Sequence, residues 1–204
     1  MEPFSNTTGL MVPMERANVD TDQIIPAVFL KSIERSGFGP NLFYNWRFLP
    51  DGSLNSDFIL NAPEYQGASI LVTGKNFGCG SSREHAVWAL MDYGIRAIIS
   101  TSFAEIFHKN CLEMGLVPVL VPEETVTEVM GKAQKRTGST VTVDLEQCLI
   151  MDDEGLHERF VVHNDPQTHE FRRHCLLNGL DEIGLTLEHV DKILQYEQKR
   201  GLAE

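Results

Sequence analysis

The sequence predicts an α/β fold in which a parallel β/α/β core is joined to an antiparallel β portion. Short apolar runs at 68–72, 96–100 and 117–121 alternate with longer stretches of helical character. Such alternation produces parallel strands joined by right-handed crossovers. Between residues 141 and 162, three short segments alternate in polarity, as paired antiparallel strands do.

The other elements follow from the same patterns. Residues 7–14 are expected to form a first strand. Helices are expected at 84–93, from Ser102 to Gly115, and at 122–135, 168–177 and 187–199. Thr101 or Ser102 is expected to cap the second of these helices, because Glu105 follows Ser102 at the spacing of a capping box.

The chain, residues 1–204, is predicted to be one domain, because 204 residues suffice for one substantial core. Residues 35–67 are rich in glycine, proline, asparagine and aromatic residues. Flexible linkers lack aromatic residues, so this segment is expected to be a packed insertion. Residues 164–204 are expected to hold the two C-terminal helices.

Composition excludes several classes of function. The net charge of −12 argues against a nucleic-acid partner. No apolar run approaches the ~20 residues of a membrane span, and the N-terminus lacks the basic and apolar regions of a signal peptide. We therefore expect a cytoplasmic protein that contacts neither nucleic acid nor membrane.

The cysteines predict no metal centre on this chain. They stand at positions 79, 111, 148 and 175, and no Cys-x-x-Cys motif occurs. Neither a zinc ribbon nor an iron–sulfur motif is therefore visible. Reduced thiols are the simplest interpretation in a cytosolic protein.

Residues 73–86, TGKNFGCGSSREHA, contain the densest group of chemically useful side chains. Glycines let backbone N–H groups turn inward, and Ser81 or Ser82 is expected to cap the following helix. The start of that helix carries a partial positive charge. Arg83 adds a planar cation that suits a carboxylate, and Lys75 is a further local cation. The loop is predicted to be an anion pocket that contains hydroxyl groups.

Known loop types do not explain this segment. The phosphate-binding P-loop requires Ser or Thr after Gly-Lys, but Asn76 follows Lys75. The dinucleotide fingerprint requires a glycine where Arg83 stands. Cys79-Gly80-Ser81 only faintly echoes a papain-type motif. A structural alternative is a glycine-rich turn with a capping serine; the adjacent Ser-Ser-Arg favours a functional loop.

Other polar groups have ordinary structural explanations. Residues 18–22, NVDTD, resemble metal ligands, but an Asx-rich turn fits better because no calcium-type loop follows. His108, Cys111 and His174 lack partners at metal-ligand spacing and are expected to be structural helix residues. Residues 172–174, RRH, are interpreted as a solvated helix face or a basic patch that faces a partner.

The loop sequence NFGCGSSREHA at 76–86 closely resembles the signature of the aconitase superfamily's swivelling β/β/α domain. More narrowly, it is similar to the small-subunit family of bacterial 3-isopropylmalate dehydratases. Three further stretches match: 18–26, NVDTDQIIP; 102–107, SFAEIF; and 171–180, FRRHCLLNGL. The resemblance covers nearly the whole chain.

This resemblance implies half of a hydro-lyase that interconverts 2- and 3-isopropylmalate through 2-isopropylmaleate in leucine biosynthesis. It implies a separate large subunit, which carries a [4Fe–4S] cluster, and a small dicarboxylate substrate. Ser81 matches the serine that removes the proton. The other implied site residues hold carboxylate oxygens (Ser82, Arg83), shape the pocket (Gly80), orient active-site groups (Thr21, Asp22) or contact the isopropyl group (Leu30).

Two alternatives remain open at this stage. One is the small subunit of a related hydro-lyase acting on homoaconitate, citraconate or dimethylmalate. Lys31 bears on this choice, because relatives that bind an additional carboxylate tend to place an arginine just after the leucine. The other alternative is an anion-binding module without catalysis.

Overall fold

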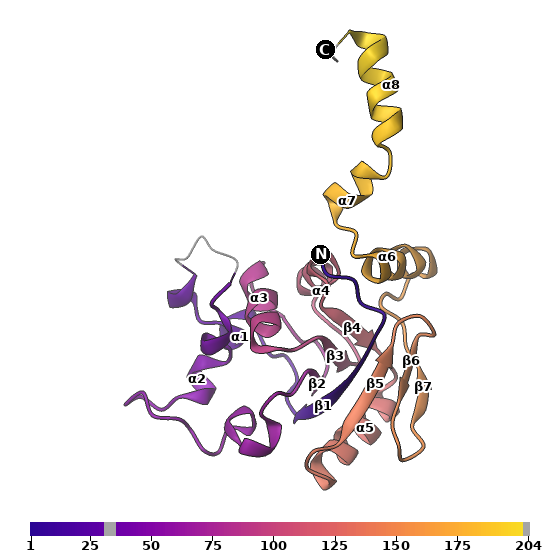
Figure 1. The fold of residues 1–204 in the computed structure, drawn as a ribbon. Helices are drawn as coiled ribbons and strands as arrows, with labels where there is room; N and C mark the ends of the chain where they lie inside the picture. The colour runs from indigo at the N-terminus through magenta and orange to yellow at the C-terminus, as the bar shows by residue number, and fades with distance from the viewer. Residues whose placement is uncertain (31–35, 202–204) are drawn as a thin grey trace.

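The computed structural model describes residues 1–30 and 36–201, and it is built around one seven-stranded mixed sheet (Figure 1). The strand order is β4-β3-β2-β1-β5-β6-β7. The strands are β1 (Asn6–Met14), β2 (Ile70–Thr73), β3 (Ala97–Ser100), β4 (Val117–Leu120), β5 (Thr140–Asp144), β6 (Leu149–Met151) and β7 (His157–Arg159). Strands β1 to β4 are parallel, whereas β5, β6 and β7 join antiparallel. The predicted α/β class, with its parallel and antiparallel portions, is confirmed.

Strand β1 joins the two portions because it is long enough to pair with both. Its first half runs antiparallel to β5, in the register Asn6↔Asp144 to Leu10↔Thr140. Its second half runs parallel to β2, in the register Met11↔Ile70 to Met14↔Thr73. Strands β2, β3 and β4 are buried throughout, as expected for a parallel sheet covered on both faces.

The sheet curls until its two edges meet. The backbone N–H of Leu120, at the end of β4, donates to the carbonyl oxygen of Val161 at 2.9 Å, and the N–H of Val161 donates back to Leu120 at 3.1 Å. Leu120 lies on one edge strand, and Val161 follows the strand at the opposite edge. This bridge leaves less of the edge-strand backbone unpaired.

Helices and short helical turns complete the fold. They are α1 (Thr21–Ile24), α2 (Tyr44–Arg47), α3 (Glu84–Tyr93), α4 (Glu105–Met114), α5 (Glu123–Lys135), α6 (Pro166–Asn178), α7 (Glu182–Leu187) and α8 (Val190–Arg200), with the 3-10 turns η1 (Ala27–Phe29), η2 (Gly39–Asn41), η3 (Ile59–Asn61) and η4 (Pro63–Tyr65). Helices α3 and α4 pack together, and α5 packs on β1, β2 and β3. Apolar side chains form two clusters, one containing α3 and residues of the 36–67 segment, the other containing α5.

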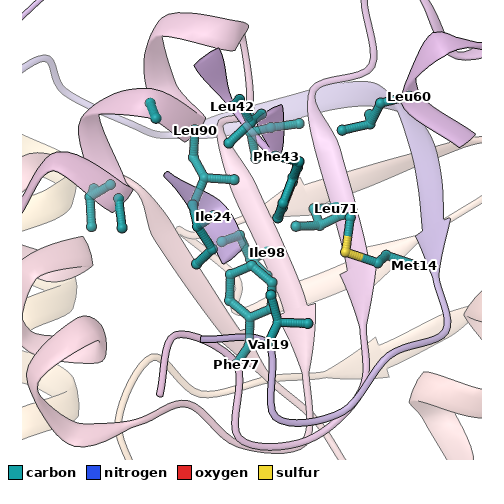
Figure 2. Packing of buried hydrophobic residues seen from close by; sticks show 14 of the residues in the cluster. Met14, Val19, Ile24, Leu42, Phe43, Leu60, Leu71, Phe77, Leu90 and Ile98 are labelled. Atoms are coloured by element: carbon teal, nitrogen blue, oxygen red, sulfur yellow. The ribbon is translucent and has the colours of Figure 1, made fainter. Parts of the chain in front are cut away.

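Residues 36–67 pack onto α3 through buried side chains. Figure 2 shows Leu42, Phe43 and Leu60 gathered with Leu71 and Leu90 in one apolar cluster. The carboxylate of Asp92, near the end of α3, accepts hydrogen bonds from the backbone N–H groups of Phe38 (2.8 Å) and Gly39 (3.3 Å). Several aromatic residues of this segment, Phe43 among them, therefore contribute to the core, and polar contacts fix the segment to the helix.

Three local predictions were wrong. Neither Ser81 nor Ser82 caps α3, because Arg83 occupies the N-cap position and makes no side-chain cap hydrogen bond. Neither Thr101 nor Ser102 caps α4, whose N-cap is Ala104. Ser102 Oγ instead accepts a hydrogen bond from a loop N–H, as described below.

The third wrong prediction is that residues 164–204 hold two helices, because the described part of this segment holds three, α6, α7 and α8. The helix expected over 187–199 corresponds to α8, and α7 was not expected. Asp181 starts α7 by accepting a hydrogen bond from the backbone N–H of Gly184 at 2.8 Å. The chain then turns at Glu188 and His189, where φ is −109° and ψ is 18° at His189. In the described part of the chain, no helix is long and apolar enough to cross a membrane.

Candidate functional site

Residues 74–83 connect β2 to α3 at the carboxyl ends of the parallel strands. The segments that follow β1 and β3 lie at the same side of the sheet, because the carboxyl ends of parallel strands lie together. In open α/β sheets ligands bind at the carboxyl ends of the strands. The loop that carries Ser81 therefore lies between two neighbouring loops.

Backbone hydrogen bonds hold the loop on both sides. Toward the β3 side, the N–H of Asn76 donates to Ser102 Oγ at 2.9 Å, and the N–H of Phe77 donates to Ser102 O at 3.3 Å. Toward the β1 side, the N–H of Gly78 donates to Val19 O at 2.7 Å, and the N–H of Thr21 donates to Cys79 O at 2.8 Å. The loop backbone is thus fixed before any ligand arrives.

Gly78 is required by its backbone conformation and by its neighbour. Its φ is +78°, in the left-handed region that glycine adopts readily. A Cβ built on Gly78 would lie 2.1 Å from Cγ of Phe107. The buried Phe107 ring on α4 therefore fills the space beneath the loop.

The hydroxyl groups of Thr21 and Ser81 lie together although 60 positions separate them. Thr21 Oγ1 donates to the backbone carbonyl of Ser81 at 3.0 Å, and the two hydroxyl oxygens are 3.4 Å apart. Thr21 is almost fully buried, whereas Gly80, Ser81 and Ser82 are exposed. A buried threonine thus anchors an exposed serine.

Arg83 pairs with Asp22 across the same gap between loops, through Nη1 and Oδ1. The Arg83 side chain is 20% exposed and that of Asp22 is 55% exposed, so this ion pair borders solvent. Arg83 also precedes the first turn of α3, which carries no side-chain cap. An exposed serine hydroxyl, a guanidinium and the start of a helix therefore face one edge of the sheet.

The structure brings together most of the residues singled out from sequence. Thr21 and Asp22 contact Ser81 and Arg83, and Thr21 Oγ1 would lie 3.3 Å from a Cβ on Gly80. Leu30 is half-buried at the end of η1 and packs against the core cluster. Lys31 lies outside the described residues. The choice between isopropylmalate and a substrate with an additional carboxylate, as far as it depends on Lys31, therefore has no structural observation behind it.

Lys75 is separate from this group. It lines a different hollow of ≈ 460 Å³ between α5 and the strand ends, with Arg16 and Met130. The roles of Ser102 and Phe107 in holding the loop were not predicted from the sequence. The available signal for Phe107 was Gly78, because a glycine lets a bulky side chain lie close to the backbone.

The thiols do not converge on a site that fits an iron–sulfur cluster. Burial raises the pKa of the thiols of Cys111, Cys148 and Cys175, and Cys79 Sγ donates to Asn18 O at 3.3 Å. Within residues 1–30 and 36–201, no group of three or more His, Cys, Asp or Glu side chains is arranged to hold a metal ion.

The predicted structural roles of two histidines are supported by their hydrogen bonds. His108 Nε2 lies 2.7 Å from the carbonyl oxygen of Val162, to which it donates. Burial lowers the pKa of His108 despite this hydrogen bond. His174 Nδ1 lies 3.2 Å from Nδ2 of Asn178, on the same helix.

Comparison with known proteins agrees with this architecture. A sequence model of the aconitase C-terminal domain matches residues 1–124, and a model of the C-terminal domain of the 3-isopropylmalate dehydratase small subunit matches residues 182–201. The 3-isopropylmalate dehydratase small subunit of Brevibacillus brevis is 50% identical over 98% of this chain and 100% of its own length. That of Neisseria gonorrhoeae is 51% identical over 98% of this chain and 95% of its own length.

The crystal structure of 3-isopropylmalate dehydratase from Methanocaldococcus jannaschii has the same fold. It superposes with a TM-score of 0.65 at 24% identity and covers 95% of this chain and 99% of its own. The fold and the loop after β2 thus define a domain of the aconitase C-terminal, or swivelling, type. Within that superfamily, the chain belongs to the family of 3-isopropylmalate dehydratase small subunits.

Proposed function

We propose that this chain is the small subunit of a cytoplasmic isopropylmalate isomerase, a hydro-lyase that interconverts 2- and 3-isopropylmalate through 2-isopropylmaleate in leucine biosynthesis. The observation that carries the proposal is the pairing of Ser81 with Thr21 beside Arg83, on a loop of the aconitase type. A dehydration of this kind needs a base for a carbon-bound proton and groups that hold two carboxylates.

Ser81 is the proposed base, and the loop explains how a hydroxyl can act as one. A serine alkoxide is unstable in water and requires nearby N–H groups or a cation. The first turn of α3, which begins just after Arg83, contributes a partial positive charge. Thr21 holds the backbone of Ser81 in place. Ser82 and Arg83 bind substrate carboxylate oxygens in this scheme, and Gly80 gives the substrate access to the backbone.

The exposure of Ser81 and Ser82 fits a site that is completed by a second protein chain. The proposed partner is the 3-isopropylmalate dehydratase large subunit, which carries the [4Fe–4S] cluster. That cluster supplies a Lewis acid for the departing hydroxyl group. The contribution of this chain is to take the proton and to orient the dicarboxylate.

Reconstitution tests the proposal. The full chain is mixed with its large subunit, and formation of isopropylmaleate is followed by absorbance. We expect turnover only in the mixture, and neither stoichiometric iron nor activity in the isolated chain. Ser81→Ala should lower kcat by about 10²- to 10⁴-fold at unchanged melting temperature, whereas the exposed Ser56→Ala should match wild type. Near-normal kcat in Ser81→Ala would remove Ser81 as the base, and failure to pair with any large subunit would favour a non-catalytic module.

A further inference from the structure

Helices α7 and α8 extend away from the sheet and the other helices (Figure 1). Their attachment to the body includes the N-terminus of the chain. The Met1 ammonium group donates to Gly179 O at 3.0 Å and pairs with Asp181 at 3.6 Å. Neither Glu182–Leu187 nor Val190–Arg200 contains a buried residue. Packing within the chain therefore does not account for the apolar residues of these helices.

Both helices present large apolar side chains to solvent. Ile183 and Leu187 are 71% and 59% exposed and lie one turn apart on α7. Val190 and Leu194 are 43% and 45% exposed and lie one turn apart on α8. We call these four residues the apolar stripe. An exposed apolar face of this kind marks an interaction surface.

The charges beside the stripe are divided along the chain. Residues 181–191 contain four acids and neither lysine nor arginine, whereas residues 192–200 contain three bases and one acid. The acids are Asp181, Glu182, Glu188 and Asp191, and the bases are Lys192, Lys199 and Arg200. A second copy laid antiparallel places the acidic half of each segment against the basic half of the other. A parallel arrangement opposes like charges instead.

The position of the stripe keeps it apart from the proposed catalytic surface. Helix α7 is attached beside Met1, which also lies near Gly115, just before β4 begins. The Ser81 loop follows the carboxyl end of β2. A protein that covers Ser81 therefore approaches the carboxyl ends of the parallel strands, whereas α7 is attached near their amino ends.

We propose that α7 and α8 form a two-fold interface between two copies of this chain, with the helices antiparallel. The apolar stripe of each copy packs against that of the other, and the acidic half of one segment faces the basic half of its partner. A two-fold axis makes one self-complementary surface sufficient for both sides.

Sedimentation velocity of the full chain across a concentration series tests the stripe. Wild type should reach a dimer, and the double variant Leu187→Glu/Leu194→Glu should raise the dimer dissociation constant at least tenfold. Ile106→Glu, at a 49% exposed position on α4, is the matched control and should behave as wild type. Circular dichroism should show equal helix content and melting temperature in all three.

Charge reversal tests the antiparallel arrangement independently of the stripe. Glu188→Lys/Asp191→Lys removes the net negative charge of the first half, which then holds two acids and two bases, and Lys199→Glu/Arg200→Glu makes the second half acidic. Each variant alone should dimerise at least tenfold more weakly, and an equimolar mixture should recover a dimer. A monomeric wild type, a dimer that survives in the stripe variant, or a mixture that remains monomeric would overturn the proposal. A stripe variant that instead fails to bind the large subunit, with wild type monomeric, would assign the surface to that partner.

Discussion

Arg83 donates a hydrogen bond from Nη1 to Oδ1 of Asp22, a residue 61 positions earlier in the chain. The pair joins the loop after β2 to the helix that follows β1, at the carboxyl edge of the sheet. It therefore fixes the direction of the guanidinium group that we propose for substrate carboxylate binding. The ion pair with Asp22 and the proposed substrate carboxylate use the same guanidinium N–H donors of Arg83. Substitutions at Arg83 and at Asp22 therefore test both roles.

Replacement of Arg83 by lysine tests the planar donor group. Lysine keeps the charge but loses the two-pronged geometry that matches a carboxylate. We expect Arg83→Lys to raise KM and to lower kcat/KM by about 10- to 100-fold, the range of one hydrogen bond to a charged group. Steady-state kinetics of the reconstituted complex measures this. Unchanged kinetics would remove Arg83 from the site.

Asp22→Asn tests whether the ion pair orients Arg83. Asp22 is more than half exposed, so its loss should change the free energy of unfolding by only about 0–1 kcal/mol. Catalysis should respond more strongly if the pair positions the guanidinium. A double-mutant cycle of Asp22→Asn with Arg83→Lys should then show non-additive effects on kcat/KM. Additive effects would contradict a positioning role.

Gly78→Ala tests the close approach of Phe107 to the loop. Gly67 provides the control, because its φ of +77° nearly equals that of Gly78 and a Cβ there meets nothing within 4 Å. Both variants incur about 1–2 kcal/mol for a left-handed backbone, and only Gly78→Ala adds overpacking of about 1–3 kcal/mol. Urea unfolding should show the larger loss for Gly78→Ala. Equal losses would mean that the ring moves aside.

The lowered pKa of His108 predicts a stability that depends on pH. Burial lowers this pKa below its ordinary value of 6.5, with smaller contributions from His163 and Arg172, while the hydrogen bond to Val162 opposes the shift. Below pH 6.5 the unfolded chain binds more protons, so the contribution is complete above that pH and is lost as the pH falls toward the folded pKa. The melting temperature should fall from pH 7.5 to 5.5, and less steeply in His108→Gln.

The exposed His157 supplies the control for this measurement. His157→Gln should leave the slope of melting temperature against pH unchanged. Burial also lowers the pKa of His169, so His108→Gln should reduce the slope without abolishing it. An unaltered slope in His108→Gln would show that His108 is not a source of the pH dependence.

Leu30→Ala tests the choice of substrate. In the proposed complex Leu30 contacts the isopropyl group, and one methylene in such a pocket changes binding by about 1–3 kcal/mol. The variant should therefore lose more kcat/KM for isopropylmalate than for the smaller citramalate. Equal losses of kcat/KM for both substrates would show that Leu30 does not contact the isopropyl group. A preference of the wild-type complex for homoaconitate would favour the related hydro-lyase.

The α/β class, the central strands and the loop that carries Ser81 could be predicted from the sequence. The runs at 68–72, 96–100 and 117–121 are continuous and apolar because a parallel sheet is buried on both faces. Glycines, serines and an arginine close together are likewise visible without coordinates. These features are local in the chain, so local patterns predict them.

The contacts that give those features their geometry are visible only in the folded chain. The pairing of Thr21 with Ser81, the meeting of Leu120 with Val161 and the place of Ser102 beneath Asn76 join residues far apart in sequence. The same contacts explain why Ser102 does not cap α4: its hydroxyl is already bonded to the neighbouring loop. Local spacing predicts a helix cap only when no donor from a distant part of the chain binds the capping hydroxyl instead. Such a distant donor does not appear in the local pattern of a single sequence.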